Sequence, residues 1–211
     1  MITFLRHKYF QFIERWQQEG FLVACWFYLY RCDEEVPVAR DLATLRPAKE
    51  PAGILPVILD LGPDNFDSHE LHYPLRSHQE QVKRYLLRGY RAFVMVRDGV
   101  VIGNLWYVTR TTSHLTRLHP HLQWYGIDLG PHEVYMFDMY VDPKERGNSL
   151  TTWFMTSALL NLRNYGYDKA YGSFNAHNLP ALWVHRLIGY EEKSHVMVRR
   201  FLIYKTAHAK D

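Results

Sequence analysis

The clearest hydrophobic pattern in the chain lies in residues 134–165. Val134 to Val141 is a short apolar run rich in Tyr, Phe, Met and Val, which predicts a buried strand. From Leu150 to Tyr165 the apolar positions fall three or four apart, which predicts a helix, and Gly166 is placed to end it. The polar residues 142–149 between them therefore predict a short turn from strand to helix.

Similar patterns predict the elements on either side of this unit. Leu5 to Trp16 has an apolar face at helical spacing, which predicts an amphipathic helix at the start of the chain. Asp98-Gly99 between two apolar runs predicts a tight hairpin. Further strands are expected at 36–42, 54–61, 91–96, 100–109, 170–174 and within 191–205, with helices at 79–87 and 178–189.

Composition and charge narrow the class of protein. The 211 residues are 47% hydrophobic and 15% aromatic, which indicates a folded globular chain. We expect a helical extension and connector at residues 1–50 and one main domain at 51–211. With 25 basic and 22 acidic residues the charge is nearly balanced, so nothing indicates a nucleic-acid partner.

The first 30 residues and the two cysteines bear on location. Phe21 to Tyr30 is apolar but too short to span a bilayer, and no secretory signal pattern precedes it. Cys25 and Cys32 do not form a metal or redox motif, which favours a reduced, cytoplasmic chain. The first helix is expected to pack within the domain; a membrane-surface contact or a homodimer contact is the alternative.

The turn after the central strand has the features of an anion site. The first amides of a helix lack internal partners and carry the positive end of the helix dipole, so they favour a phosphate placed before them. The spacing is neither a Walker sequence nor a dinucleotide fingerprint.

Two linked motifs carry a resemblance to a known family. One is Val141-Asp-Pro-Lys-Glu-Arg146-Gly147 before a helix, and the other is Asn178-x-x-Ala181-x-x-x-His185-x-x-x-Gly189-Tyr190 after the next strand. Together they resemble the signatures of the GNAT superfamily of N-acetyltransferases, over roughly the last two thirds of the chain. The resemblance implies an α/β (α+β) fold: a mixed, mostly antiparallel sheet flanked by helices.

The resemblance also implies a cofactor site for acetyl-CoA or another acyl-CoA. The central strand would pair with the pantetheine arm, and Asn178 would hold that arm or the turn beside it. Ser149 and Thr151 stand where the family usually has Gly or Ala, and their side chains could narrow the site or donate hydrogen bonds to it. The residues that would bind the cofactor are Met139, Tyr140, Val141, Arg146, Gly147, Asn148, Ser149, Leu150, Thr151 and Asn178.

Three residues are candidates for catalysis. Asp138 is expected to be an internal acid of the central strand, serving either as the base that deprotonates an amine or as an anchor for a neighbouring group. Glu133 is a second candidate base. His185 stands where the family often has a Tyr that protonates the leaving thiolate, so an imidazolium is expected to do the same; a structural role is the alternative.

The expected function is direct transfer of an acyl group from acyl-CoA to the primary amine of a small molecule. An acyl-CoA sensing module or a structural interaction protein is the alternative. No metal is expected, because His119 and His121 lack the further convergent ligands that a site needs. With His114 and Trp124 they are instead expected to contact the acceptor.

Overall fold

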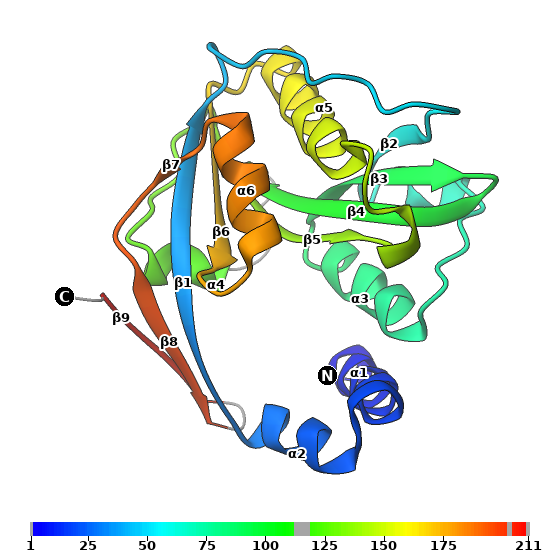
Figure 1. Cartoon of the computed structure of the whole chain (residues 1–211), viewed down its shortest axis with the longest axis vertical. Helices are drawn as coiled ribbons and strands as arrows, with labels where there is room; N and C mark the ends of the chain where they lie inside the picture. Colours follow the sequence, from blue (N-terminus) through cyan, green and yellow to red (C-terminus); the bar gives the residue numbers. More distant parts are fainter. Residues whose placement is uncertain (1, 112–118, 202–203, 210–211) are drawn as a thin grey trace.

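The computed structural model describes residues 2–111, 119–201 and 204–209. Within these residues, helices cover both faces of a mixed sheet (Figure 1). The helices are α1 (Ile2–Glu19), α2 (Phe21–Leu29), α3 (Arg76–Leu86), α4 (Pro120–Trp124), α5 (Leu150–Asn164) and α6 (Leu179–Ile188), with short 3-10 turns η1 (Phe66–Ser68) and η3 (Pro143–Glu145). The strands are β1 (Tyr30–Asp41), β2 (Val57–Leu61), β3 (Arg91–Arg97), β4 (Val100–Thr109), β5 (Glu133–Val141), β6 (Lys169–Asn175), β7 (Glu191–Glu192), β8 (Val196–Phe201) and β9 (Tyr204–Ala209).

The sheet has the strand order β2-β3-β4-β5-β6-β1-β8-β9, and β7 pairs with β1. Neighbouring strands are antiparallel except β5 and β6, which are parallel. The predicted fold class is therefore confirmed. The β3–β4 hairpin also turns where expected, with φ of 51° at Asp98 and 74° at Gly99, as a tight turn of this kind requires.

Strand β1 is the main departure from the sequence-based expectation for residues 1–50. A helical extension with a short strand at 36–42 is expected there, yet β1 runs from Tyr30 to Asp41 inside the sheet, between β6 and β8. Glu35, for example, lies opposite Asn175 on one side and Val196 on the other. The paired residues of β6 and β8 follow at least 128 residues later, so the local pattern could not place β1 in the sheet.

Buried side chains form a core on each face of the sheet. Phe154 and Leu159 of α5 belong to the core on one face. Tyr85 of α3 and Leu122 of α4 pack with Trp106 in the core on the other. Burying a large apolar side chain stabilises a fold by about 1.5–3 kcal/mol. The sheet is therefore fixed between two packed layers, and this makes it a rigid support for a site.

Helix α1 packs on α3 through polar contacts at Ser77. The ring of His7 donates from Nδ1 to the Ser77 carbonyl at 3.0 Å. The Glu14 carboxylate accepts from the Ser77 amide at 3.1 Å and from its hydroxyl at 2.5 Å, close to the N-terminus of α3, where an acid is favourable. Burial lowers the pKa of His7 to about 4, which keeps the ring neutral at physiological pH. The expected packing of the first helix within the domain is thus observed.

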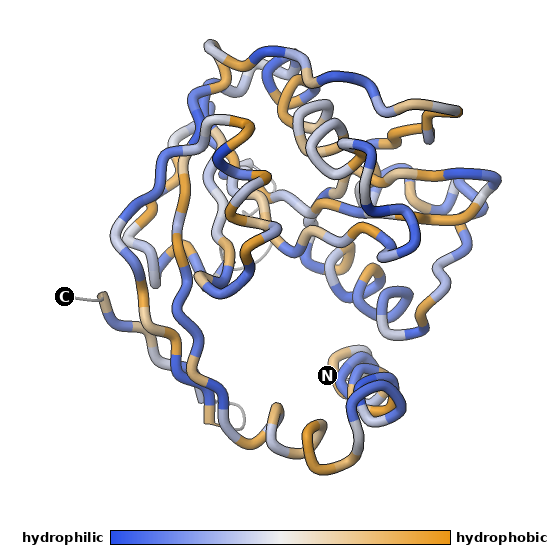
Figure 2. Tube along the Cα trace, viewed as in Figure 1, coloured by the Kyte–Doolittle hydropathy of each residue, from blue (hydrophilic) through white to orange (hydrophobic). Residues whose placement is uncertain are grey.

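Helix α2 is apolar around its circumference, as Figure 2 shows by its orange colour. Leu22 and Trp26 are 80% and 66% exposed. No helix among the described residues is both long and apolar enough to cross a bilayer. A membrane-surface or homodimer contact through this region stays a prediction.

Candidate active site

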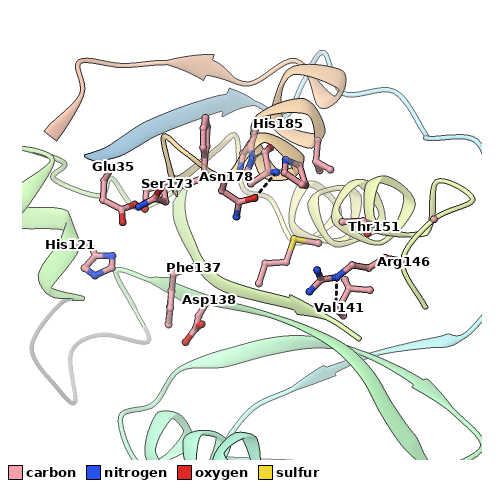
Figure 3. A pocket seen from close by; sticks show the side chains of 17 residues that line it. Glu35, His121, Phe137, Asp138, Val141, Arg146, Thr151, Ser173, Asn178 and His185 are labelled. Atoms are coloured by element: carbon pink, nitrogen blue, oxygen red, sulfur yellow. Dashed lines mark hydrogen bonds between the residues drawn. The ribbon is translucent and has the colours of Figure 1, made fainter. Parts of the chain in front are cut away.

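Strands β5 and β6 pair only near their beginnings, and this opens the sheet. Glu133–Tyr135 lie in parallel register with Lys169–Tyr171, and no further pairs join the described parts of the two strands. A cavity of about 560 Å³ lies between the separated ends, with α6 forming another wall. Figure 3 shows Arg146 and Thr151 toward one end of this cavity and Glu35, His121 and Ser173 toward the other.

A β-bulge places Asp138 in the wall of this cavity. Leu105 of β4 lies opposite both Asp138 and Met139, and Asp138 has a φ of 54°. Because the bulge breaks the alternation of the strand, the Asp138 side chain is exposed, so the prediction of an internal acid is wrong. Its Oδ2 accepts a hydrogen bond from the Tyr85 hydroxyl at 2.6 Å and another from the Gln81 amide.

The turn before α5 forms the opposite end of the cavity. Arg146, Gly147 and Thr151 line it, and Arg146 Nε donates to the Val141 carbonyl at 2.9 Å. The backbone takes positive φ at three successive residues, Gly147 (119°), Asn148 (45°) and Ser149 (64°). This left-handed run reverses the chain at the start of the helix, although it disfavours a residue with a Cβ.

The other predicted cofactor residues lie in different environments. Met139 and Val141 line the cavity, whereas the Tyr140 ring lies 4.3 Å from that of His78 in a neighbouring hollow. Leu150 is buried in the core and Asn148 is exposed. Ser149 lines a separate cavity with Arg40 and Thr44, so it does not narrow this one.

Helix α6 contributes Asn178 and His185 to the cavity. Asn178 caps the helix as predicted, its Oδ1 accepting from the Ala181 amide at 3.2 Å. His185 Nδ1 lies 2.7 Å from the Ala181 carbonyl, which can only accept, so Nδ1 carries the proton and Nε2 of the neutral ring has a free lone pair. Burial against Phe174 and the rest of the core lowers the pKa of His185. Both features oppose the expected imidazolium acid.

Glu133 lies apart from the cavity. Its carboxylate accepts from the Gly130 amide at 2.8 Å and from the Tyr171 hydroxyl at 3.0 Å. It is not among the residues that line the cavity. The structure therefore does not bring Glu133 and Asp138 together, and gives Glu133 a role in holding the loop before β5.

Glu35 of β1 lines the cavity and was missed by sequence reasoning. It lies at the end away from Arg146 (Figure 3). Burial, followed by the nearby Asp33 carboxylate, raises the pKa of Glu35 to about 7. The acidic run 33–35 before an apolar strand is the only local signal for it, and this signal does not reveal which strands flank β1.

Hydroxyl groups surround this end of the cavity. The Tyr125 hydroxyl donates to Ser173 Oγ at 3.0 Å, and the Tyr135 hydroxyl lies 3.5 Å from the same atom. His121 Nδ1 lies 3.1 Å from the Tyr135 hydroxyl, and burial lowers the pKa of His121 to about 3, so its ring is neutral. The expected acceptor contact His121 thus lines the cavity, whereas His114 lies outside the described residues. Across the part of the chain that is described, no group of three His, Cys, Asp or Glu side chains could hold a metal.

The sequence matches the model of the acetyltransferase (GNAT) family over residues 55–190, which is more than half of the chain. The chain belongs to this family. Acetyl-CoA is the donor that this family uses. A comparison with curated proteins finds no significant match.

Three solved structures share the fold. A tandem GNAT protein from the clavulanic acid biosynthesis pathway is 18% identical, with a TM-score of 0.53 over 81% of this chain and 54% of that one. A Drosophila protein is 11% identical, with a TM-score of 0.51 over 88% of this chain and 57% of that one. The glucosamine N-acetyltransferase region of a fungal multi-domain enzyme is 16% identical, with a TM-score of 0.50 over 92% of this chain and 22% of that one. The chain thus spans little more than half of the first two and about a fifth of the third.

Proposed function

We propose that this GNAT protein transfers an acetyl or other acyl group from acyl-CoA to a primary amine of a small molecule. The observation that carries the proposal is the cavity between the separated ends of β5 and β6. It extends from the turn at Arg146 and Gly147 to the carboxyl group of Glu35, whose pKa is raised to about 7. Separated strands and a basic turn are what binding of the donor would require. A nearby carboxyl group is what deprotonation of the amine would require.

The residues of the cavity fit the proposed donor. Arg146 and the amides of Gly147, Asn148, Ser149 and Thr151 would hold the diphosphate, because a cation and a helix N-terminus both attract it. The region around Gly147 is open, since a Cβ built there would meet nothing within 4 Å. The backbone of Met139–Val141 would pair with the pantetheine arm, and Asn178 lies across the cavity from that strand.

Glu35 is the better candidate for the base that prepares the amine. When bound, acyl-CoA supplies a thioester carbonyl carbon at which a neutral amine can attack. A carboxyl group with a pKa of about 7 is partly ionised at physiological pH and holds a proton well once it has taken one, which suits general base catalysis. Asp138 is the alternative base, held in place by Tyr85 and Gln81.

The transfer is proposed to be direct. Neither Cys25 nor Cys32 lines the cavity, so neither is placed to form a covalent intermediate. The Met139 amide, beside the bulge, is proposed to polarise the carbonyl group. Both cysteines are unpaired, which supports the further proposal of a cytoplasmic location.

Calorimetric titration with acetyl-CoA tests donor binding, with Arg146→Ala and Lys144→Ala as matched variants. Each removes one positive charge from the same turn, but only Arg146 lines the cavity. We expect Arg146→Ala to weaken binding at least tenfold and Lys144→Ala to change it little. Equal effects, or no saturable binding by the wild type, would overturn the proposed donor site. Saturable binding without thiol release over a broad amine panel would instead favour an acyl-CoA sensing module.

A further inference from the structure

A second cavity, of about 250 Å³, adjoins the first at Asp138, which lines both. Its walls come from six elements, α1, α2, α3, β5, β8 and β9. In Figure 1, α1, α2, β8 and β9 lie in the lower part of the molecule. The residues that line it are His7, Lys8, Gln11, Tyr28, Gln81, Arg84, Tyr85, Asp138, Arg200 and Lys205.

Four of these side chains are basic and one is acidic. The cations are Lys8 of α1, Arg84 of α3, Arg200 of β8 and Lys205 of β9. Among the ion pairs between described residues, none includes any of the four. The one acid, Asp138, already accepts hydrogen bonds from Tyr85 and Gln81. The cavity therefore holds an excess of positive charge.

The two lysines respond to this excess. Burial, then the charges of Arg200, Arg84 and Lys205, lower the pKa of Lys8 to about 8. Burial, then Arg200 and Arg84, likewise lower the pKa of Lys205 to about 8. Burial is the largest cause at both lysines and the neighbouring cations add to it, whereas Asp138 acts in the opposite direction on Lys8.

Nearby carboxylates offset the charge only in part. Asp33 and Glu35 raise the pKa of Arg200, yet burial and Arg31 outweigh them and the pKa of Arg200 is lowered. Asp33 is already paired with Arg31.

Two buried donors in the same cluster lack acceptors. Nε of Arg84 and Nε of Arg200 are inaccessible to solvent and have no hydrogen-bond partner. Buried donors of this kind are normally satisfied, so the protein leaves part of the hydrogen-bonding capacity of these two guanidinium groups unused. Other polar groups are fixed nearby: Gln11 Oε1 accepts from Lys8 Nζ and from the Tyr28 hydroxyl, each at 3.0 Å.

We propose that this second cavity binds an anionic group, a carboxylate or a phosphate, that the amine acceptor carries. The inference rests on the proposed function, because it places the anion among the cations and the amine near Asp138 and Glu35. Guanidinium groups suit the planar, two-oxygen edge of either anion. The acceptor class is thus an amino acid or a phosphorylated amine, rather than a neutral or purely cationic amine.

Anion binding is tested directly with inorganic phosphate and with acetate, titrated by calorimetry into protein saturated with CoA. Saturation with CoA occupies the turn at Arg146, so the remaining binding reports the second cavity. The variants are Arg200→Gln and Lys8→Gln, with Arg199→Gln as the matched control. Arg199 is exposed on the same strand and does not line the cavity. Removing one of several mutually repelling cations should leave the fold intact, and thermal denaturation checks this.

We expect one saturable site for phosphate or acetate, weakened at least tenfold in Arg200→Gln and in Lys8→Gln and unchanged in Arg199→Gln. CoA affinity should be the same in all four proteins. The probe that binds with the higher affinity, phosphate or acetate, indicates whether the acceptor carries a phosphate or a carboxylate. No saturable binding, or equal affinities in Arg200→Gln and Arg199→Gln, would overturn the inference. Failure of CoA to bind would overturn the proposed function, while the contrast between these two variants would still decide the anion site.

Turnover gives the second readout, with amino acids compared with their amides and phosphoethanolamine compared with ethanolamine. We expect kcat/KM for the anionic member of a pair to exceed that of its neutral partner at least tenfold. Arg200→Gln should abolish this preference by raising KM for the anionic member alone. Neutral members that react as well as anionic ones, with no change in Arg200→Gln, would overturn the inference.

Discussion

Replacing Glu35 with Gln distinguishes a catalytic role of this residue from a structural one, because the two roles predict opposite changes in the stability of the protein at pH 8. The folded protein raises the pKa of Glu35 from 4.5 to about 7. The contribution of Glu35 to the stability of the fold is therefore fully present below pH 4.5, and about 3 kcal/mol of it is lost as the pH rises from 4.5 to 7. Glu35→Gln removes this loss, so at pH 8 the variant should be more stable than the wild type by up to about 3 kcal/mol.

The same substitution should remove most of the activity. A positioned general base contributes roughly 100- to 10,000-fold to a rate, so we expect a decrease of that size in kcat/KM. The assay is thiol release between pH 5.5 and 9, with an acceptor whose amine titrates well above neutral pH. The wild-type kcat/KM should rise to a plateau above pH 7 as Glu35 ionises, whereas the variant should show no such plateau and should increase only with the neutral fraction of the amine.

The control for Glu35→Gln is Glu191→Gln. Glu191 is an exposed carboxylate on β7 that does not line the cavity. Its variant should keep the wild-type profile. A Glu35→Gln protein that retains both the rate and the rise near pH 7 would refute the reasoning and make Asp138 the base. Loss of activity together with loss of stability at pH 8 would make Glu35 a structural residue.

Three further substitutions test other parts of the structure. Ser149→Gly should stabilise the protein by about 1 kcal/mol in thermal denaturation, because φ is 64° there, and acetyl-CoA affinity should be kept; a less stable variant would contradict this. His185→Phe should keep kcat within about threefold of the wild type, since the neutral ring does not donate a proton from Nε2. A hundredfold decrease in kcat at unchanged stability would restore its role as an acid. Relative to His7→Asn, the wild type should lose about 3 kcal/mol of stability as the pH falls from 6.5 to 4, because burial lowers the pKa of His7 and protonation then favours the unfolded chain. Urea denaturation of the two proteins measures this difference, and parallel pH curves would show that His7 is not responsible.

Local sequence patterns were sufficient to predict those elements that are determined by residues close together in the chain. The Asp98-Gly99 hairpin follows from two residues that adopt positive φ. Helix α5 follows from its apolar spacing, and the Asn178 cap from a side chain that reaches an amide three residues later. The turn at Arg146 could be predicted in the same way, because the strand before it and the helix after it are its direct neighbours in the sequence.

Contacts between distant segments account for what could not be predicted. Glu35 lines the cavity only because β1 inserts between β6 and β8, and nothing in residues 30–41 specifies those partners. Asp138 is exposed because Leu105 of another strand lies opposite two residues at the bulge. The cation cluster of the second cavity likewise combines four elements.

A crystal structure of the protein with bound CoA tests the central claim most directly. The account predicts the diphosphate against the amides that follow Arg146, and the pantetheine arm between β5 and β6 with its thiol near Asp138. A ligand bound elsewhere, or strands β5 and β6 closed together along Met139–Val141 with no space for the arm, would contradict it.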